Sequence, residues 1–313
     1  MAPETVSAIL DKVATLWPQA NDLEVTLEAN PSSVEAGRFR GFHQAGVNRI
    51  SMGIQALNDN DLKRLGRIHS VQEAFDAFDT ARTEFDRVSF DLIYARQDQT
   101  LEHWSKELRQ ALSMAIDHLS LYQLTIEQGT AFGDRYNRGG LRGLPSDDTA
   151  ADMYLATQDI CAEFDMPAYE VSNHAKIGSE SRHNLIYWRY GDYIGIGPGA
   201  HGRVTINGQK FATENHLHPK AWLDAVASGS GESLCDPISA ADQGAEYLLM
   251  GMRINAGVSL SRYVEITGQA LSESVLSELI DLGMIDVLGD QLKTTVTGRP
   301  VLNAILDRLL VDQ

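Results

Sequence analysis

The apolar residues of the first 126 positions alternate between two kinds of spacing. Runs with the period of a strand predict strands at 23–28, 49–55, 88–94 and 118–126. Apolar residues three or four positions apart predict helices at 1–16, 33–45, 59–65, 71–85 and 101–115. Strands that alternate with helices in this order favour βαβ units and a parallel sheet, and therefore the α/β class.

The pattern is less regular beyond residue 126. A segment rich in Gly and Arg, 135–148, predicts a loop, and a helix is expected over 146–164 with Ser146 as its N-cap. The Gly- and Ser-rich residues 228–233 are typical of a linker. Three helices are expected at 240–251, 259–267 and 272–282, followed by a pair of short strands within 284–295. Helices followed by a β-hairpin indicate a small winged-helix-like domain at the C-terminus.

Polar residues stand at or near the carboxyl ends of the predicted strands. They are Glu28, Gln55, Asp91 and Gln123. In a parallel α/β barrel the strand ends converge on one face, so these side chains predict a polar ligand pocket. The alternative is that they cap helices or pair with Arg64, Arg67 or Arg96. Because the sequence begins on a helix, we expect part of the wall of this pocket to be missing.

Two further segments could bind a ligand. RHNLIYW, at 182–188, combines a histidine that can ligate a metal with two aromatic residues, which would suit an iron porphyrin. A packed aromatic turn with a hydrogen-bonded histidine is the alternative. GPGAHG, at 197–202, matches a dinucleotide fingerprint by letter, but no acidic residue follows at the required distance. A glycine turn that admits close backbone contact is the preferred interpretation.

Composition narrows the possible partners and cofactors. The formal net charge is −17, which argues against nucleic acid and anionic membranes as partners. No run of about 18 apolar residues occurs, so a cytoplasmic protein is expected. The two cysteines, Cys161 on a predicted helix and Cys235 in a predicted loop, exclude a disulfide framework. They also exclude a cluster held by three or more cysteines of this chain.

Six segments in order resemble one known family. They are LEANP, NRISMGIQALNDNDLKRLGRIHS, FDLIYARQDQT, LSLYQLTIEQGT, RHNLIYW and GIGPGAHG. Together they resemble the oxygen-independent coproporphyrinogen III oxidase-like group of radical SAM proteins. HNLIYW is similar to the HNxxYW motif of the haem chaperones of the HemW type. The resemblance implies an incomplete parallel (βα)6 barrel over 1–205, a linker region over 206–232 and an accessory domain over 233–313.

The resemblance also implies ligands. Glu28, Gln55, Arg67 and Asp91 match contacts to S-adenosylmethionine, and Tyr122 and Thr125 fall near further contact positions. Carboxylates suit the cationic and hydroxyl groups of this ligand, and a guanidinium suits its carboxylate. For haem, the resemblance implies His183 as the ligand of the iron, with Tyr187 and Trp188 packing beside it.

The implied function is that of a haem chaperone, which passes haem to an acceptor apo-protein of unspecified identity. Peripheral contact with membrane-bound haem proteins is a further expectation. One alternative is the family's oxidative decarboxylation of coproporphyrinogen III in porphyrin biosynthesis. Another is an inactive, truncated fragment. Whether the chain is an enzyme stays open.

The sequence departs from the family at its start. The family holds a [4Fe–4S] cluster on a C-x-x-x-C-x-x-C loop, and neither this loop nor the Gly-Gly-Thr-Pro segment is present. We therefore expect that the chain cannot ligate the cluster by itself. The first βα unit and the second strand are expected to be absent through truncation, lineage loss or a misplaced start codon, the last being favoured.

Overall fold

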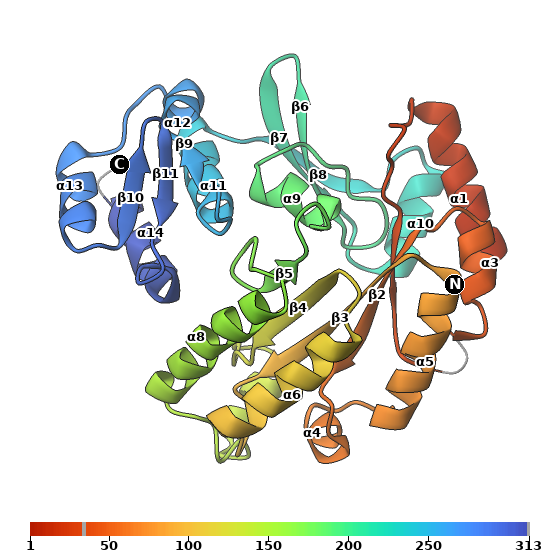
Figure 1. Ribbon diagram of the computed structural model, residues 1–313. Coiled ribbons are helices and arrows are strands. Elements are labelled where there is room, and N and C mark those ends of the chain that lie inside the picture. The colour runs from red at the N-terminus through yellow and green to blue at the C-terminus, as the bar shows by residue number, and fades with distance from the viewer. Residues whose placement is uncertain (33–35, 312–313) are drawn as a thin grey trace. The chain divides into compact units, whose positions relative to one another are not determined.

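The computed structural model describes residues 1–32 and 36–311. By compactness the chain divides into two units, Met1–Glu180 and Ser181–Gln313 (Figure 1). This division lies 25 residues before the expected end of the barrel domain at residue 205. Each unit is described by itself below.

The first unit contains a mixed five-stranded sheet. Its strands, in spatial as well as chain order, are β1 (Thr26–Ala29), β2 (Arg49–Gln55), β3 (Arg87–Tyr94), β4 (His118–Gln123) and β5 (Asn173–Ala175). The pairings from β1 to β4 are parallel, and β5 is antiparallel to β4. The carboxyl ends of β1 to β4 therefore lie at one edge of the sheet.

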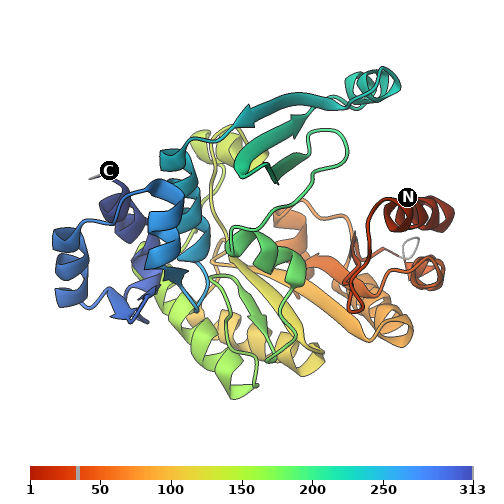
Figure 2. The ribbon, with the colours of Figure 1, turned by 90° about the horizontal axis from the view of Figure 1, so that it is seen from above.

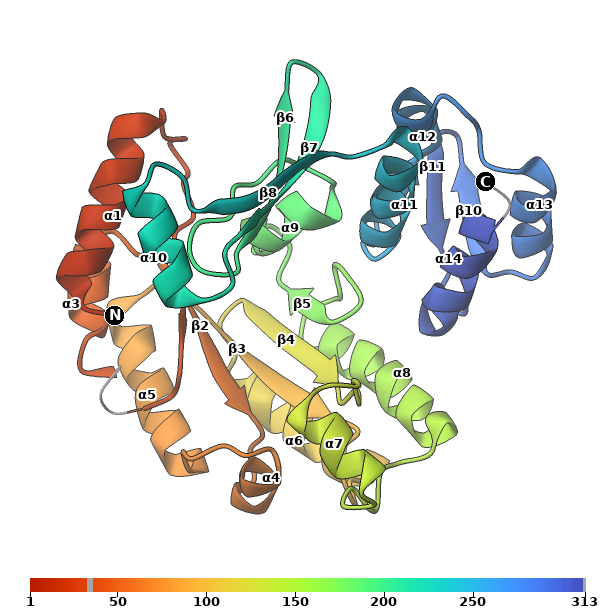
Figure 3. The same ribbon diagram turned by 180° about the vertical axis from the view of Figure 1, so that it is seen from behind.

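Helices separate the strands. They are α1 (Pro3–Leu16), α3 (Phe39–Gln44), α4 (Asp59–Arg64), α5 (Val71–Glu84), α6 (Leu101–Met114), α7 (Ala131–Asn137) and α8 (Asp147–Glu163). Figures 1 and 3 show α5, α6 and α8 on one face of the sheet. Phe78 of α5, Trp104 of α6 and Met153 of α8 are fully buried there against strand residues such as Leu92 and Leu119. This apolar layer fixes the sheet on which the polar strand ends stand.

Local signals start the helices of this unit. Ser70 and Glu73 form a capping box at α5, and Thr100 accepts a hydrogen bond from the backbone of His103 at α6. Ser146 caps α8, as the sequence predicted. The strand expected over 23–28 is confirmed in shortened form as β1. Residues 33–35 of the helix expected over 33–45 lie outside the described residues.

Two elements of this unit were not expected. Part of the segment predicted as a loop over 135–148 belongs to α7, which Thr130 caps through the backbone N–H of Gly133. The three residues of β5 carry no periodic pattern, so only their pairing with β4 makes them a strand.

The second unit begins with α9 (Arg182–Trp188) and a three-stranded antiparallel sheet. The strands are β6 (His201–Ile206), β7 (Gln209–Asn215) and β8 (Glu232–Pro237), and α10 (Pro219–Ala227) connects β7 to β8. Residues 206–232 were expected to form a linker, but they contain β7 and α10. Asn207 and Gly208, both with positive φ, turn β6 into β7. Asn-Gly is a strong hairpin signal, so the sequence did carry a local indication of these strands. Cys235 lies on β8 rather than in a loop.

The rest of the second unit holds four helices and a small sheet. The elements are α11 (Ala240–Gly251), β9 (Val258–Ser259), α12 (Leu260–Thr267), α13 (Glu273–Asp281), β10 (Ile285–Leu288), β11 (Gln291–Thr294) and α14 (Leu302–Val311), with a 3-10 turn at Arg299–Val301. Figure 2 shows the helices around the sheet, whose strand order is β10-β11-β9. The three predicted helices and the predicted hairpin are present, and β9 and α14 were not predicted. Among the described residues, no helix is both long and apolar enough to cross a membrane.

Candidate functional site

The carboxyl ends of β1 to β4 surround a cavity of about 360 Å³. Its lining residues are Glu28, Ala29, Asn30, Ser51, Gly53, Gln55, Arg67, Asp91, Ser120 and Tyr122. The residues matched to S-adenosylmethionine thus lie together, except Thr125, which is exposed and outside this lining. Gln123, the fourth strand-end residue, lines a separate cavity of about 640 Å³. Asn30, Ser51 and Ser120 were not expected. The strand period could have indicated two of them, because Ser51 lies four residues before Gln55 and Ser120 lies two before Tyr122.

Gln55 and Asp91 form the centre of the cavity. Gln55 Nε2 donates a hydrogen bond to Asp91 Oδ2 at 2.8 Å. The pairing of β2 with β3 shifts register between Met52 and Gln55, and Gln55 has a φ of 75°. A positive φ is rare for a residue other than Gly, and such strain is often found at functional sites. A Cβ at Gly53 would lie only 3.2 Å from Gln55 Nε2, so the glycine keeps space for this side chain.

Among residues 1–32 and 36–311, no cation is in ion-pair contact with the carboxyl group of Asp91. Burial raises its pKa to about 6, although the hydrogen bond from Gln55 and the charge of Arg67 lower it. The backbone N–H groups of Asp91 and Ile54 also favour the charged form. Yet within the described residues, Oδ1 is buried without a partner in hydrogen-bonding geometry. A buried acceptor without a donor is costly, so a ligand that supplies a donor to this atom would bind favourably here.

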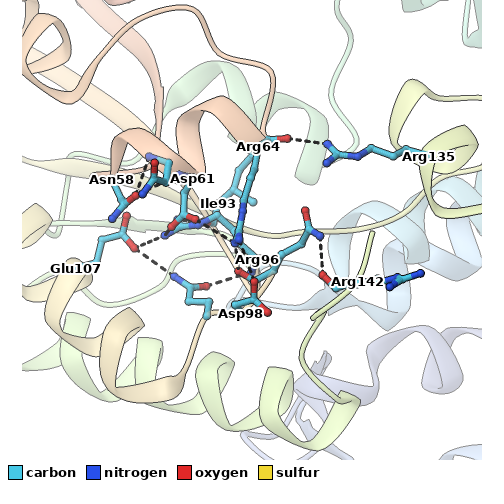
Figure 4. Close-up of polar contacts among 12 residues, drawn as sticks. Asn58, Asp61, Arg64, Ile93, Arg96, Asp98, Glu107, Arg135 and Arg142 are labelled. Atoms are coloured by element: carbon cyan, nitrogen blue, oxygen red, sulfur yellow. Dashed lines mark hydrogen bonds and ion pairs between the residues drawn. The ribbon is translucent and has the colours of Figure 1, made fainter. Parts of the chain in front are cut away.

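The arginines that could have neutralised the strand-end carboxylates bind other groups (Figure 4). Arg96 pairs with Asp61 at 3.0 Å and with Glu107, and Arg64 pairs with Asp98 at 3.0 Å. We call these five residues the Arg96 cluster. Arg64 and Arg96 are thus paired with carboxylates outside the cavity. Arg67 is the arginine of the expected set that lines the cavity. The polar pocket is therefore favoured over the ion-pair alternative.

The expected haem segment forms a short helix rather than a turn. Ser181 caps α9 by accepting a hydrogen bond from the backbone of Asn184. His183 and Tyr187 are four residues apart, so they share one face, with ring centroids 4.7 Å apart and ring planes at 81°. Tyr193 extends this row, its ring centroid 4.4 Å from that of Tyr187. His183 is exposed, and Tyr187 is half-buried.

Trp188 lies on a different face of α9. The guanidinium of Arg253 stands 4.6 Å from the centre of the Trp188 ring. The backbone carbonyl of Trp188 lies near Gly251 of α11. Its indole nitrogen is buried and has no hydrogen-bond partner among the described residues. The structure thus brings His183 and Tyr187 together and separates Trp188 from them. Tyr193 was missed by sequence reasoning, although its place among the dense aromatics was visible.

The cysteines do not form a metal site. Cys161 is buried in α8, where burial raises its pKa to about 12, and Cys235 is exposed on β8. Across residues 1–32 and 36–311, no group of three or more His, Cys, Asp or Glu is arranged to hold a metal ion. The side chains present therefore do not fit a cysteine-ligated iron–sulfur cluster.

Comparison with known proteins assigns the family. Residues 3–111 match the model of the radical SAM superfamily, and residues 238–301 match that of the HemN C-terminal domain. The chain is 37% identical to the heme chaperone HemW of Escherichia coli, over 98% of this chain and 80% of that protein. This chain belongs to the HemN-like family of radical SAM proteins.

Two further matches agree with this assignment. A mouse protein named radical S-adenosyl methionine domain-containing protein 1, mitochondrial, is 37% identical over 99% of this chain and 72% of its own length. The solved structure of coproporphyrinogen III oxidase (HemN) from Escherichia coli, described as a radical SAM enzyme, superposes with a TM-score of 0.80. It covers 100% of this chain and 75% of that one at 18% identity, and so supports the α/β radical SAM fold.

Proposed function

We propose that this protein is a haem chaperone of the radical SAM family, which binds haem and passes it to an acceptor apo-protein. The observation that carries the proposal is a row formed by the exposed His183 and the half-buried Tyr187 and Tyr193, on a chain 37% identical to a protein named as a heme chaperone. An exposed imidazole offers a nitrogen to the haem iron, and the tyrosine rings offer apolar surface beside it. Trp188, on another face of α9, packs against the guanidinium of Arg253.

The haem-ligand assignment is tested by titrating the purified chain with haem and following the Soret band. We expect His183→Ala to weaken haem binding by at least about tenfold and to shift the Soret maximum, because the iron loses a ligand. His218→Ala is the matched control, since His218 is an exposed histidine of the same unit and should leave the titration unchanged. An unchanged Soret band in His183→Ala would remove His183 from the haem site.

We propose further that the strand-end cavity binds S-adenosylmethionine. Glu28 and Asp91 would accept hydrogen bonds from its cationic and hydroxyl groups, and Arg67 would pair with its carboxylate. When bound, the ligand supplies a sulfonium centre that activates the adjacent carbon. The unpartnered Asp91 Oδ1 fits this role, whereas the cysteines do not fit the iron–sulfur cluster.

Equilibrium dialysis with S-adenosylmethionine tests this site. Glu28→Gln and Asp91→Asn should each weaken binding by about 10- to 100-fold, as expected for losing a hydrogen bond to a charged group. Glu163→Gln changes an exposed glutamate on α8 and should have no effect on binding. Equal affinities in all four proteins would contradict the proposal.

Other expectations continue as parts of this proposal. They are an incomplete (βα)6-type barrel, a winged-helix-like C-terminal domain, an apo-protein acceptor, membrane-bound haem proteins as contacts and a cytoplasmic location. The decarboxylase alternative is less favoured, because identity to the named chaperone is higher than identity to the solved oxidase.

A further inference from the structure

Glu170 is a buried carboxylate that lies outside the cavity lining. It has 0% exposure and stands in the turn that precedes β5. Its Oε1 accepts hydrogen bonds from the backbone N–H of Ser172 at 2.8 Å and from Asn173 Nδ2 at 2.6 Å. Burying a carboxylate is expensive even when it is hydrogen-bonded, so a role beyond closing a turn is indicated.

Asn173 connects this carboxylate to the cavity. It is the register partner of Ser120 across the antiparallel pair of β4 and β5. Ser120 Oγ donates to Asn173 Oδ1 at 2.5 Å, and Ser120 lines the cavity. A carboxylate only accepts, so the amide NH₂ of Asn173 must face Glu170 and its oxygen must face Ser120. The proton of Ser120 is therefore committed to Asn173 and is not available to the cavity.

We propose that Glu170 is a positioning residue: through Asn173 it fixes Ser120 as a hydrogen-bond acceptor in the cavity, which thereby selects ligands that donate. A serine hydroxyl has two lone pairs, so Ser120 can accept from a ligand while its proton stays on Asn173. The series of hydrogen bonds through Glu170, Asn173 and Ser120 sets, from outside the cavity, which way the Ser120 hydroxyl points.

Several other polar groups of the cavity also accept, whereas Asn30, Ser51 and Tyr122 can both donate and accept, and Tyr122 is hydrogen-bonded to Ser120. Glu28 and Asp91 Oδ1 accept, and Gln55 uses its Nε2 on Asp91, which leaves an amide oxygen. Arg67 provides a donor for one anionic group. The cavity is therefore matched to a ligand with several donors and one carboxylate, as S-adenosylmethionine has. In this respect the inference rests on the proposed S-adenosylmethionine site.

The test measures the dissociation constant of S-adenosylmethionine on the full chain by calorimetry. In Glu170→Leu, Asn173 Nδ2 loses its acceptor, so the amide of Asn173 is no longer fixed and can turn Nδ2 toward Ser120. Glu170→Gln is the conservative control, because its amide oxygen can still accept from the N–H of Ser172 and from Asn173 Nδ2, and it should bind as the wild type does. We expect binding to weaken about 3- to 10-fold in Glu170→Leu, as for one misdirected neutral hydrogen bond. Ser120→Ala should weaken binding by a similar factor.

A double-mutant cycle separates positioning from a structural role. If Glu170 acts through Ser120, adding Glu170→Leu to Ser120→Ala should change the dissociation constant less than about twofold. Ser89→Ala is the control, because Ser89 is a buried serine of the same sheet whose bond to Arg49 lies at the amino ends of the strands. It should lower the stability and leave binding unchanged.

The outcomes are distinguishable. A wild-type chain that does not bind S-adenosylmethionine overturns the proposed cavity ligand and this inference together. A chain that binds, but whose affinity is the same in Glu170→Leu or falls independently of Ser120, overturns the positioning role alone. If Glu170→Leu does not fold, unchanged binding by Ser120→Ala overturns the inference as well.

Discussion

The strand-end cavity and the Arg96 cluster follow the same strands, but they differ in whether their carboxylates are paired with a cation. In the Arg96 cluster, Arg96 bonds both Asp61 and Glu107 (Figure 4). In the cavity, Asp91 bonds the neutral amide of Gln55 and keeps a buried oxygen without a partner among the described residues. The Arg96 cluster pairs a buried cation with two carboxylates, although Arg96 Nε has no hydrogen-bond partner among the described residues. Asp91 has no cation in ion-pair contact within the same residues, and its Oδ1 could take a donor from a ligand.

This difference distinguishes charged groups that stabilise the fold from charged groups that are available to bind a ligand. Buried ions that pair within the protein hold in place the loops in which they lie. Removing one partner leaves the other charge buried without compensation, which destabilises the fold. A buried carboxylate without its own cation instead destabilises the empty protein. It can recover that energy when a ligand supplies the missing donor.

The largest effect is expected for Arg96→Met. Arg96 is almost fully buried, so the change leaves Asp61 and Glu107 without their cation and should lower the free energy of unfolding by about 3–5 kcal/mol. Urea denaturation measures it. The double variant Arg96→Met with Glu107→Met should recover part of the loss, because fewer unpaired charges remain. A loss below about 1 kcal/mol would show that the cluster does not stabilise the fold.

The next effect is a pH-dependent gain for Asp91→Asn. The pKa of Asp91 is about 6 in the folded protein and ordinarily 3.8, so below pH 3.8 the carboxyl is protonated in both states. As the pH rises to 6, the unfolded state ionises first, and the folded state loses stability relative to it. The variant lacks this penalty, and its free energy of unfolding should exceed that of the wild type by about 3 kcal/mol at pH 8.

Urea unfolding of the two proteins at pH 4, 6 and 8 gives this difference. The gain should be smallest at pH 4 and should approach its full value above pH 6. If the gain in stability is the same at every pH, or if the variant is less stable than the wild type at pH 8, the prediction is wrong, and the charged form of Asp91 is stabilised in the folded protein.

A smaller effect is expected for Gln55→Ala. The Nε2 of Gln55 favours the charged form of Asp91, so its loss should raise the pKa of Asp91 further. The lost hydrogen bond should cost about 1 kcal/mol of stability. Carbon-13 NMR of the aspartate carboxyls follows the titration. Gln97→Ala removes a glutamine that bonds the carbonyl of Arg142 and should leave the pKa of Asp91 unaltered.

The smallest effect is expected for Arg109→Ala. Arg109 and Glu163 form an ion pair that is about half-exposed on both sides, so water replaces the partner that is removed. Urea denaturation should show no resolvable change. A loss comparable with that of Arg96→Met would mean that burial is not what distinguishes the Arg96 cluster.

Much of the fold could be predicted because its signals are local. The alternation that placed 49–55 and 88–94 as strands needs only neighbouring residues, and β2 and β3 occupy these positions. The helix at 182–188 was missed because aromatic and β-branched residues have low helix propensity, although His183 and Tyr187 have helical spacing. The hairpin at Asn207 and Gly208 shows a local signal that was present and not used.

The sequence by itself determined the alternation of strands and helices up to residue 123, the polar residues at the strand ends and the shortage of cysteines. These features depend on spacing and composition, which the chain carries at every position. Only the tertiary structure decided which charges are neutralised: Arg96 meets Asp61 and Glu107, while Asp91 meets Gln55. Burial and the distance to an opposite charge arise between segments far apart in the chain, so no local pattern encodes them.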